Sequence, residues 1–127
     1  MSRYSLLTLR ALWELLRYDI VYSIFGFSRI HREMDALRVR SQSTDSEIAT
    51  SICDAVSLAA CFYWKPALCL QRSVAAARML RKYGVDGRLV IGYRPSPFLS
   101  HAWVEVGDRV VNDSQSYKRR LLVLCRT

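Results

Sequence analysis

The sequence lacks the patterns that most readily identify a metalloprotein or a disulfide-rich protein. Its four cysteines form no C-x-x-C pair and no regular framework, and its two histidines, His31 and His101, lie far apart. Structural zinc sites usually show paired ligands at short spacing, so we expect no metal and no cofactor. Free thiols are typical of a reducing compartment, and we therefore expect a cytoplasmic protein.

The N-terminal region also lacks a hydrophobic run of the length that a signal peptide or a membrane span requires. Arg10, Glu14, Arg17 and Asp19 interrupt its apolar positions, and the longest uncharged stretch there covers residues 20–28. A bilayer needs about 20 consecutive apolar residues. The sequence therefore predicts no cleaved signal and no transmembrane segment.

Acidic residues are scarce beside basic ones, at 11 against 19, which leaves a formal net charge of +8. This charge favours an acidic partner, and nucleic acid, an anionic membrane face and an acidic protein surface all fit it. The 127 residues, 51% of them hydrophobic, have the length and composition of one globular domain with one core.

The most informative stretch runs from Cys69 to Gly84. Its strong helix formers predict a helix that Gly84 ends in a left-handed conformation, with Arg78 and Lys82 exposed on its outer side. Pro66 helps to begin a new element, which places Cys69 in the first helical turn. Backbone N–H groups and the helix dipole favour a thiolate there, and a thiolate is the nucleophile of cysteine chemistry. The alternative is a buried structural cysteine.

Residues 4–22 predict an amphipathic helix that Gly26 breaks or bends. We favour a helix packed on the domain's own core; the alternative is a docking surface anchored by Trp13, Phe25 and Phe27. The expected apolar face, opposite Arg10, Glu14 and Arg17, consists of Leu6, Leu9, Leu12, Trp13, Leu16 and Ile20.

The next segment, residues 29–40, is strongly basic and leads into a polar run, residues 41–46, that is typical of a linker. We expect residues 1–42 to form the helix and basic linker, and residues 43–127 to form the core of a single overall domain. Thr44 and Glu47 match a capping box for a helix that ends near residue 62. Its expected buried face consists of Ile48, Ile52, Ala55, Val56, Ala59 and Ala60.

After Gly84 the hydrophobic period changes from that of a helix to that of a strand. We expect strands at residues 89–93, 100–106, 109–113 and 121–124, with residues 95–97 interrupting the first. His101, Trp103 and Glu105 would share one face of the second strand. Helices followed by an antiparallel meander define an α+β fold.

His101 begins one predicted strand and Asp113 ends the next, so hairpin register decides whether they meet. A turn of residues 107–108 alone would leave Asp113 on the wrong side, whereas a loop of residues 106–108 would place it opposite His101. In that register Asp113 would orient the imidazole, and Cys69 would complete a set of nucleophile, base and orienting group. The alternative is a half-exposed strand histidine and an unrelated turn aspartate.

Several segments together carry a more specific signal: C-L-Q-R-S from Cys69, L-R-K-Y-G-V from Leu80, L-V-I-G from Leu89, H-A-W-V-E-V from His101 and V-V-N-D from Val110. With P-F at 97–98, they resemble the lasso peptide leader peptidases of the transglutaminase-like superfamily over about residues 50–113. The run of His-Ala-Trp-Val-Glu after a C-x-x-R-S helix is quite specific. Relatives often carry Asp-Gly where this chain has Gly-Asp at 107–108, which leaves the loop geometry open.

The resemblance implies a transglutaminase-like, papain-like core in which Cys69, His101 and Asp113 form the triad of a bacterial cysteine peptidase. Its substrate would be the leader of a ribosomally made lasso precursor. Some relatives carry a fused leader-recognition domain for which this chain has no room. We therefore expect it to act with a separate leader-recognition protein and a lasso cyclase, and without nucleic acid. The N-terminal helix would be a candidate docking site.

The oxyanion donors are expected to be backbone N–H groups at the start of the cysteine helix. Other candidate oxyanion or substrate contacts are Leu70, Tyr63, Trp64, Arg72, Trp103 and Glu105, and the last three have an equally good structural use. Two other functions stay open. An amide acyltransferase would pass the acyl-thioester to an amine, and a basic adaptor would bind nucleic acid with a strong dependence on salt.

Overall fold

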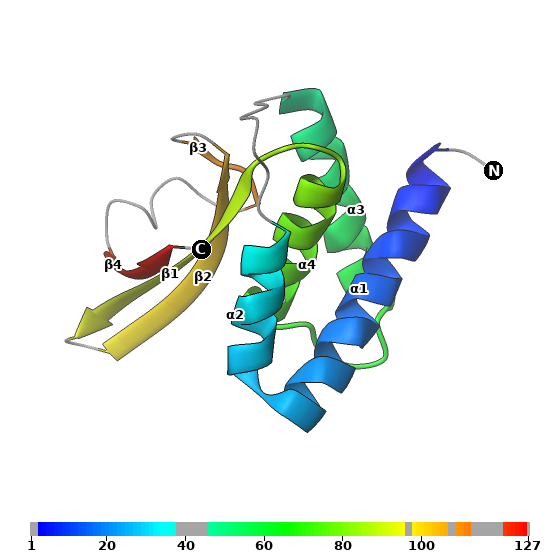
Figure 1. Cartoon of the computed structure of the whole chain (residues 1–127). Helices are drawn as coiled ribbons and strands as arrows, with labels where there is room; N and C mark the ends of the chain where they lie inside the picture. Colours follow the sequence, from blue (N-terminus) through cyan, green and yellow to red (C-terminus); the bar gives the residue numbers. More distant parts are fainter. Residues whose placement is uncertain (1–2, 38–45, 96–97, 107–108, 113–120, 127) are drawn as a thin grey trace.

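The chain folds into four helices followed by a four-stranded antiparallel sheet, which confirms the predicted α+β class (Figure 1). The computed structural model describes residues 3–37, 46–95, 98–106, 109–112 and 121–126. The helices are α1 (Arg3–Phe25), α2 (Phe27–Ala36), α3 (Ser46–Phe62) and α4 (Cys69–Lys82). The strands are β1 (Gly87–Pro95), β2 (Phe98–Val106), β3 (Arg109–Val110) and β4 (Leu122–Arg126).

Helix α4 is the central element, because it packs on β1 and β2 on one side and on α1 and α3 on the other (Figure 1). Its ends are those that the sequence predicts. Leu68, in an extended conformation, precedes it, and Gly84 follows it with a φ of 82°. This left-handed conformation costs glycine little, so Gly84 ends the helix and directs the chain into β1.

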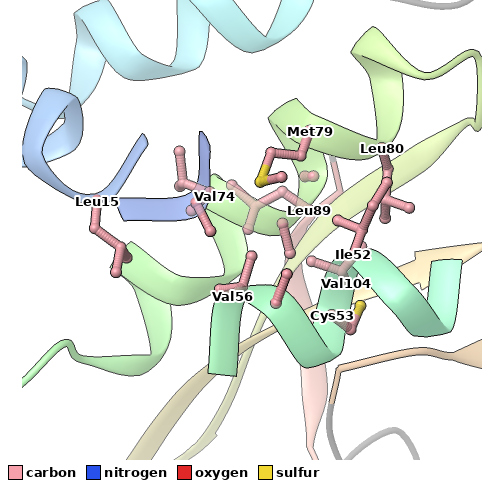
Figure 2. Packing of buried hydrophobic residues seen from close by; sticks show 14 of the residues in the cluster. Leu15, Ile52, Cys53, Val56, Val74, Met79, Leu80, Leu89 and Val104 are labelled. Carbon is pink, nitrogen blue, oxygen red and sulfur yellow. The ribbon is translucent and has the colours of Figure 1, made fainter. Parts of the chain in front are cut away.

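The hydrophobic core lies between the helices and one face of the sheet, where Ile52, Val74 and Leu80 meet Leu89 and Val104 (Figure 2). A second, smaller cluster on the other face contains Val90, Trp103, Val110 and Leu121. Alternate residues of β2 therefore serve two different clusters. This is the period of two that the sequence predicts for this strand.

The sheet has the strand order β3-β2-β1-β4. The strands β1 and β2 form a hairpin with continuous pairing from Gly87 opposite Val106 to Pro95 opposite Phe98. The last strand, β4, pairs with β1, so it lies at the sheet edge away from β3 and not beside it. The meander thus comprises β1 to β3, and the chain then returns to the far edge.

The register between β2 and β3 is not the one that would pair His101 with Asp113 along the strands. Val106 pairs with Arg109 and Glu105 with Val110, which is the register of the two-residue turn and not of the three-residue loop. The third strand is also shorter than predicted, because the chain bends at Val111 and Asn112. Since the ladder ends there, strand parity no longer decides on which side Asp113 lies.

Helix α1 packs on the common core, which confirms the favoured prediction, but it does so with a different face from the one predicted. Its buried apolar residues are Leu7, Ala11, Leu15 and Val21. Most of the predicted apolar face is between 40% and 56% exposed, and this outer face consists of Leu6, Leu9, Trp13, Leu16 and Ile20. Small Ala11 lets the neighbouring helices approach closely, and this favours the observed face.

Two charged side chains that were expected to be solvated are buried against one another. The Nε of Arg78 lies 2.7 Å from a carboxylate oxygen of Glu14, and the Nζ of Lys82 lies 2.8 Å from the other oxygen. Burying a charge is costly unless it is paired. This requirement turns Glu14 inward, toward Arg78, and so contributes to the orientation of α1.

Part of the predicted basic linker is helical. Residues 27–36 form α2, whose Ile30 and Met34 are buried in the core. Glu33 on the same helix pairs with Arg17 at 2.6 Å and with Arg78 at 3.5 Å. The boundary at residue 42 stays a prediction, since it and the capping residue Thr44 lie outside the described residues.

None of the described helices combines the length and the apolar character that a bilayer-spanning helix needs.

Candidate active site

Cys69 is the first residue of α4, as predicted, and its side chain is half-buried. The first turn closes through a 3.0 Å hydrogen bond from the Arg72 N–H to the Leu68 carbonyl. In such a turn the N–H groups before Arg72 have no intrahelical acceptor, so they can stabilise a negative charge next to the thiol.

His101 lies in β2 opposite Gly92 of β1, and its ring stacks on Trp103 with 6.3 Å between ring centroids. Trp103 is fully buried, and its Nε1 donates a 2.9 Å hydrogen bond to Glu105. A Cβ at Gly92 would lie 2.6 Å from the indole, so only glycine leaves room for this ring. The predicted shared face of His101, Trp103 and Glu105 is therefore present, and buried contacts hold it in place.

Asp113 lies outside the described residues, but its neighbour Asn112 is well placed. The Asn112 Oδ1 accepts a 2.8 Å hydrogen bond from the Val104 N–H, and its Nδ2 donates to the Ser73 Oγ at 3.1 Å. Ser73, which is fully buried, in turn donates to the Ala102 carbonyl at 3.1 Å. We call these four residues the Ser73 junction.

The Ser73 junction joins the three chain segments that carry the predicted triad. Ser73 lies one helical turn after Cys69, Ala102 follows His101, and Asn112 precedes Asp113. The prediction did not single out Ser73 or Asn112, although both belong to the segments that carry the family resemblance. The signals in the sequence were a serine on the apolar face of the predicted cysteine helix, Ser73, and an asparagine directly before Asp113, Asn112.

The loop before Cys69 is held by polar contacts to α1. The Tyr63 hydroxyl donates to the carboxylate of Asp19, which also pairs with the Lys65 ammonium at 2.9 Å. The Gln71 side chain donates a 2.9 Å hydrogen bond to the Leu15 carbonyl. Burial and the hydrogen bond to Asp19 both raise the pKa of Tyr63, so this phenol stays protonated.

The remaining candidate contact residues have different surroundings. Trp64 is exposed beside Lys65, and Leu70 is half-buried next to Cys69. The Arg72 guanidinium reaches the Ser57 hydroxyl at 3.4 Å, which is a long hydrogen bond. A role of these residues, or of Tyr63, Trp103 and Glu105, in substrate or oxyanion binding remains a proposal.

Within the part of the chain that the structure describes, histidine, cysteine and acidic side chains form no group of three that would hold a metal ion.

Comparison with known proteins gives a match to a single protein and a match to the sequence model of a family. The microcin J25-processing protein McjB of Escherichia coli is 46% identical over 56 residues, which are 44% of this chain and 27% of that protein. This chain thus spans about a quarter of the length of that relative. No solved structure matches the chain significantly. The sequence model of the transglutaminase-like superfamily matches residues 12–126, well over half of the chain. The chain therefore belongs to the transglutaminase-like superfamily.

Proposed function

We propose that this protein is a cysteine peptidase that removes the leader from a lasso peptide precursor. Cys69 would be the nucleophile, His101 the general base and acid, and Asp113 the group that orients the imidazole. The superfamily match and the similarity to a microcin-processing protein support this reaction class.

The observation that carries the proposal is the Ser73 junction. Hydrogen bonds of 2.8 to 3.1 Å join α4, β2 and the segment after β3. Ala102 and Asn112 adjoin His101 and Asp113 in sequence, and Ser73 lies one helical turn after Cys69. Catalytic groups must keep their relative positions to within a fraction of an ångström, and buried hydrogen bonds are a means of doing so. A fully buried serine bonded to two strand segments fits that purpose.

The proposed reaction has two steps. The Cys69 sulfur bonds to the carbonyl carbon of the scissile peptide, and the C–N bond breaks as the imidazolium of His101 gives its proton to the leaving amine. Water then attacks the carbonyl carbon of the thioester and gives a proton to His101. The C–S bond breaks, so the leader leaves with a free carboxylate and the Cys69 thiolate is restored. The freed amine of the core peptide would be available for macrolactam formation by a cyclase.

We propose further that a separate leader-recognition protein brings the precursor to this chain. The exposed outer face of α1 (Leu6, Leu9, Trp13, Leu16 and Ile20) would be the docking surface. An apolar patch of this kind is a common mark of a protein interface.

The decisive experiment compares three variants in cleavage of a lasso precursor with the recognition protein present. Cys69→Ala removes the covalent route and should reduce cleavage to background, with His101→Ala nearly as damaging. Asp113→Asn should cost roughly tenfold to a thousandfold, below the ~10⁴ loss known for serine triads, because a thiol needs less help from its base. Circular dichroism checks that each variant is folded.

Product analysis separates hydrolysis from acyl transfer, because only hydrolysis yields a leader with a free carboxylate. A folded Cys69→Ala variant that cleaves at the normal rate would exclude this mechanism.

A further inference from the structure

A pocket of about 260 Å³ lies between α1 and the chain segment that contains the proposed nucleophile. Tyr18 and Tyr22 of α1 form one side, and Leu68 and Leu70, the two sequence neighbours of Cys69, line the other side. Sites for whole small molecules usually measure about 300–1,000 Å³. The pocket is below that range, so its size suits one side chain of a larger ligand.

The walls of the pocket are mainly apolar and open to solvent. The rings of Tyr18 and Tyr22 stack with 5.6 Å between centroids and 12° between planes, and Pro66 adds another apolar surface. Tyr22 and Leu68 are exposed in the free protein. A ligand that covered them would remove apolar surface from water, which favours binding.

The charged groups of the pocket already have partners within the protein. The Asp19 carboxylate pairs with Lys65 and accepts a hydrogen bond from Tyr63, and Gln71 donates to the Leu15 carbonyl. Burial raises the pKa of Tyr18 to about 12, with smaller contributions from nearby groups that include Cys69, so the phenol is neutral. A charged ligand side chain would lose hydration here and would have to compete with the existing ion pair of Asp19 and Lys65.

We propose that this pocket is a specificity subsite that receives a neutral, apolar side chain of the peptide substrate, within two residues of the cleaved bond on its acyl side. The inference rests on the proposed function, because it requires Cys69 to be acylated. The acyl half stays attached through both chemical steps, whereas the amine departs after the first. A pocket near Cys69 can therefore hold the acyl half of the substrate through both steps, whereas it could hold the amine half only during the first.

The test uses dipeptidyl chloromethyl ketones, whose acyl-side residues lie where a substrate's would, and in which the Cys69 sulfur displaces chloride. Each of the two side chains is varied in turn among leucine, phenylalanine, alanine, aspartate and lysine. Alkylation of Cys69 is followed by mass spectrometry, and each rate is divided by the rate with iodoacetamide, which carries no side chain. At one of the two positions, the reagents with leucine or phenylalanine should alkylate Cys69 at least ~10-fold faster than the reagent with alanine. This factor is the lower limit for small changes of a side chain in an apolar pocket. The reagents with aspartate or lysine should be slowest.

Two variants and a matched control locate the effect. Tyr22→Ala removes one wall and should reduce the preference for leucine and phenylalanine several-fold. Ile24→Ala is the control, because Ile24 lies on the same helix, is 67% exposed, and belongs neither to the pocket lining nor to the outer face of α1. Leu68→Lys adds a cation at an exposed position and should make the aspartate reagent faster than in the parent protein.

Equal rates for all five side chains at both positions would overturn the subsite while leaving Cys69 as nucleophile. A preference that Tyr22→Ala and Ile24→Ala change alike would do the same. If iodoacetamide and the ketones label Cys61 in preference to Cys69, the proposed function fails and the subsite fails with it.

Discussion

At the scale of single residues, three cysteines of the described chain differ in their surroundings. Cys53 is buried, and desolvation raises its pKa to about 12, so it stays an unreactive thiol. Cys61 is exposed but lies in the last turn of α3, at the negative end of that helix's dipole. Cys69 is less accessible but lies at the positive end of α4. Accessibility and the helix dipole thus make opposite predictions for Cys61 and Cys69.

We expect Cys69 to react with iodoacetamide near neutral pH much faster than Cys53, Cys61 or Cys125, because reactivity follows thiolate character. Mass mapping after partial alkylation measures the rates of all four cysteines in one sample. His101→Ala should slow Cys69 and leave Cys61 unchanged. Labelling led by Cys61 would contradict the assignment of the nucleophile.

Ser73 gives a second prediction at this scale. Ser73→Ala removes both hydrogen bonds of a buried hydroxyl, the one donated to the Ala102 carbonyl and the one accepted from the Asn112 Nδ2. This should destabilise the fold by about 1–3 kcal/mol. Because small displacements of catalytic groups are costly, kcat should fall by up to ~100-fold in protein that is still folded, with a smaller change in KM.

Ser57→Ala is the matched control, since Ser57 is exposed on α3 and, among the residues that the structure describes, its hydroxyl bonds only to Arg72 through a long hydrogen bond. It should leave both stability and kcat near the parent values. A Ser73→Ala protein with normal kcat and lowered stability would show that the junction serves the fold alone.

At the scale of elements, α1 has an apolar stripe on each side, and only one is used by the core. The outer face would dock the recognition protein. Leu9→Asp introduces a charge at the centre of that face, at a position 51% exposed. We expect the ratio of stimulated to unstimulated cleavage to fall at least several-fold, because burying an unpaired carboxylate in an interface is unfavourable.

Leu58→Asp controls for the added charge, because Leu58 is 49% exposed on a different helix, α3. Measuring cleavage rates over a titration of the recognition protein compares the two variants directly. If both lower the stimulation equally, or if neither does, the outer face of α1 is not the docking surface.

At the scale of the whole molecule, ion pairs link α1 to α2, to α4 and to the loop before Cys69. The hydrogen bond from Arg17 lowers the pKa of Glu33 against the opposing effect of burial. At Asp19 burial acts to raise the pKa, but hydrogen bonds from Tyr63 and Lys65 outweigh it and the pKa is lowered. Two regions of the fold thus depend on ionised carboxylates.

Stability should therefore fall in acid. A carboxyl group whose pKa is lower in the folded state stabilises the fold fully above its unfolded pKa, and that contribution is lost as the pH falls through the folded value. We expect the free energy of unfolding, measured with urea, to decrease below about pH 4.5, the ordinary value for Glu33. Glu33→Gln should cost about 1 kcal/mol at pH 7 and less at pH 3.

Asp54→Asn, at an exposed position of α3, is the control and should follow the parent curve. If Glu33→Gln lost the same stability at both pH values, ionisation of Glu33 would not be the cause.

The sequence by itself determined the features that depend on neighbouring residues. The ends of α4, the position of Cys69 in its first turn and the left-handed Gly84 follow from local propensity and local backbone conformation. The alternation along β2 likewise follows from the period of two in its sequence. These predictions needed no knowledge of what the elements pack against.

Only the tertiary structure decided which stripe of α1 faces inward, because both stripes are apolar and the choice depends on Glu14 meeting Arg78 on a distant helix. It also decided that β4 pairs with β1 and that the Asn112 side chain bonds to the Val104 N–H where the β3 ladder ends. Such contacts join residues far apart in the chain or replace a regular backbone partner. Their energy depends on burial and distance in the folded protein, which the hydrophobic pattern of a single chain does not contain.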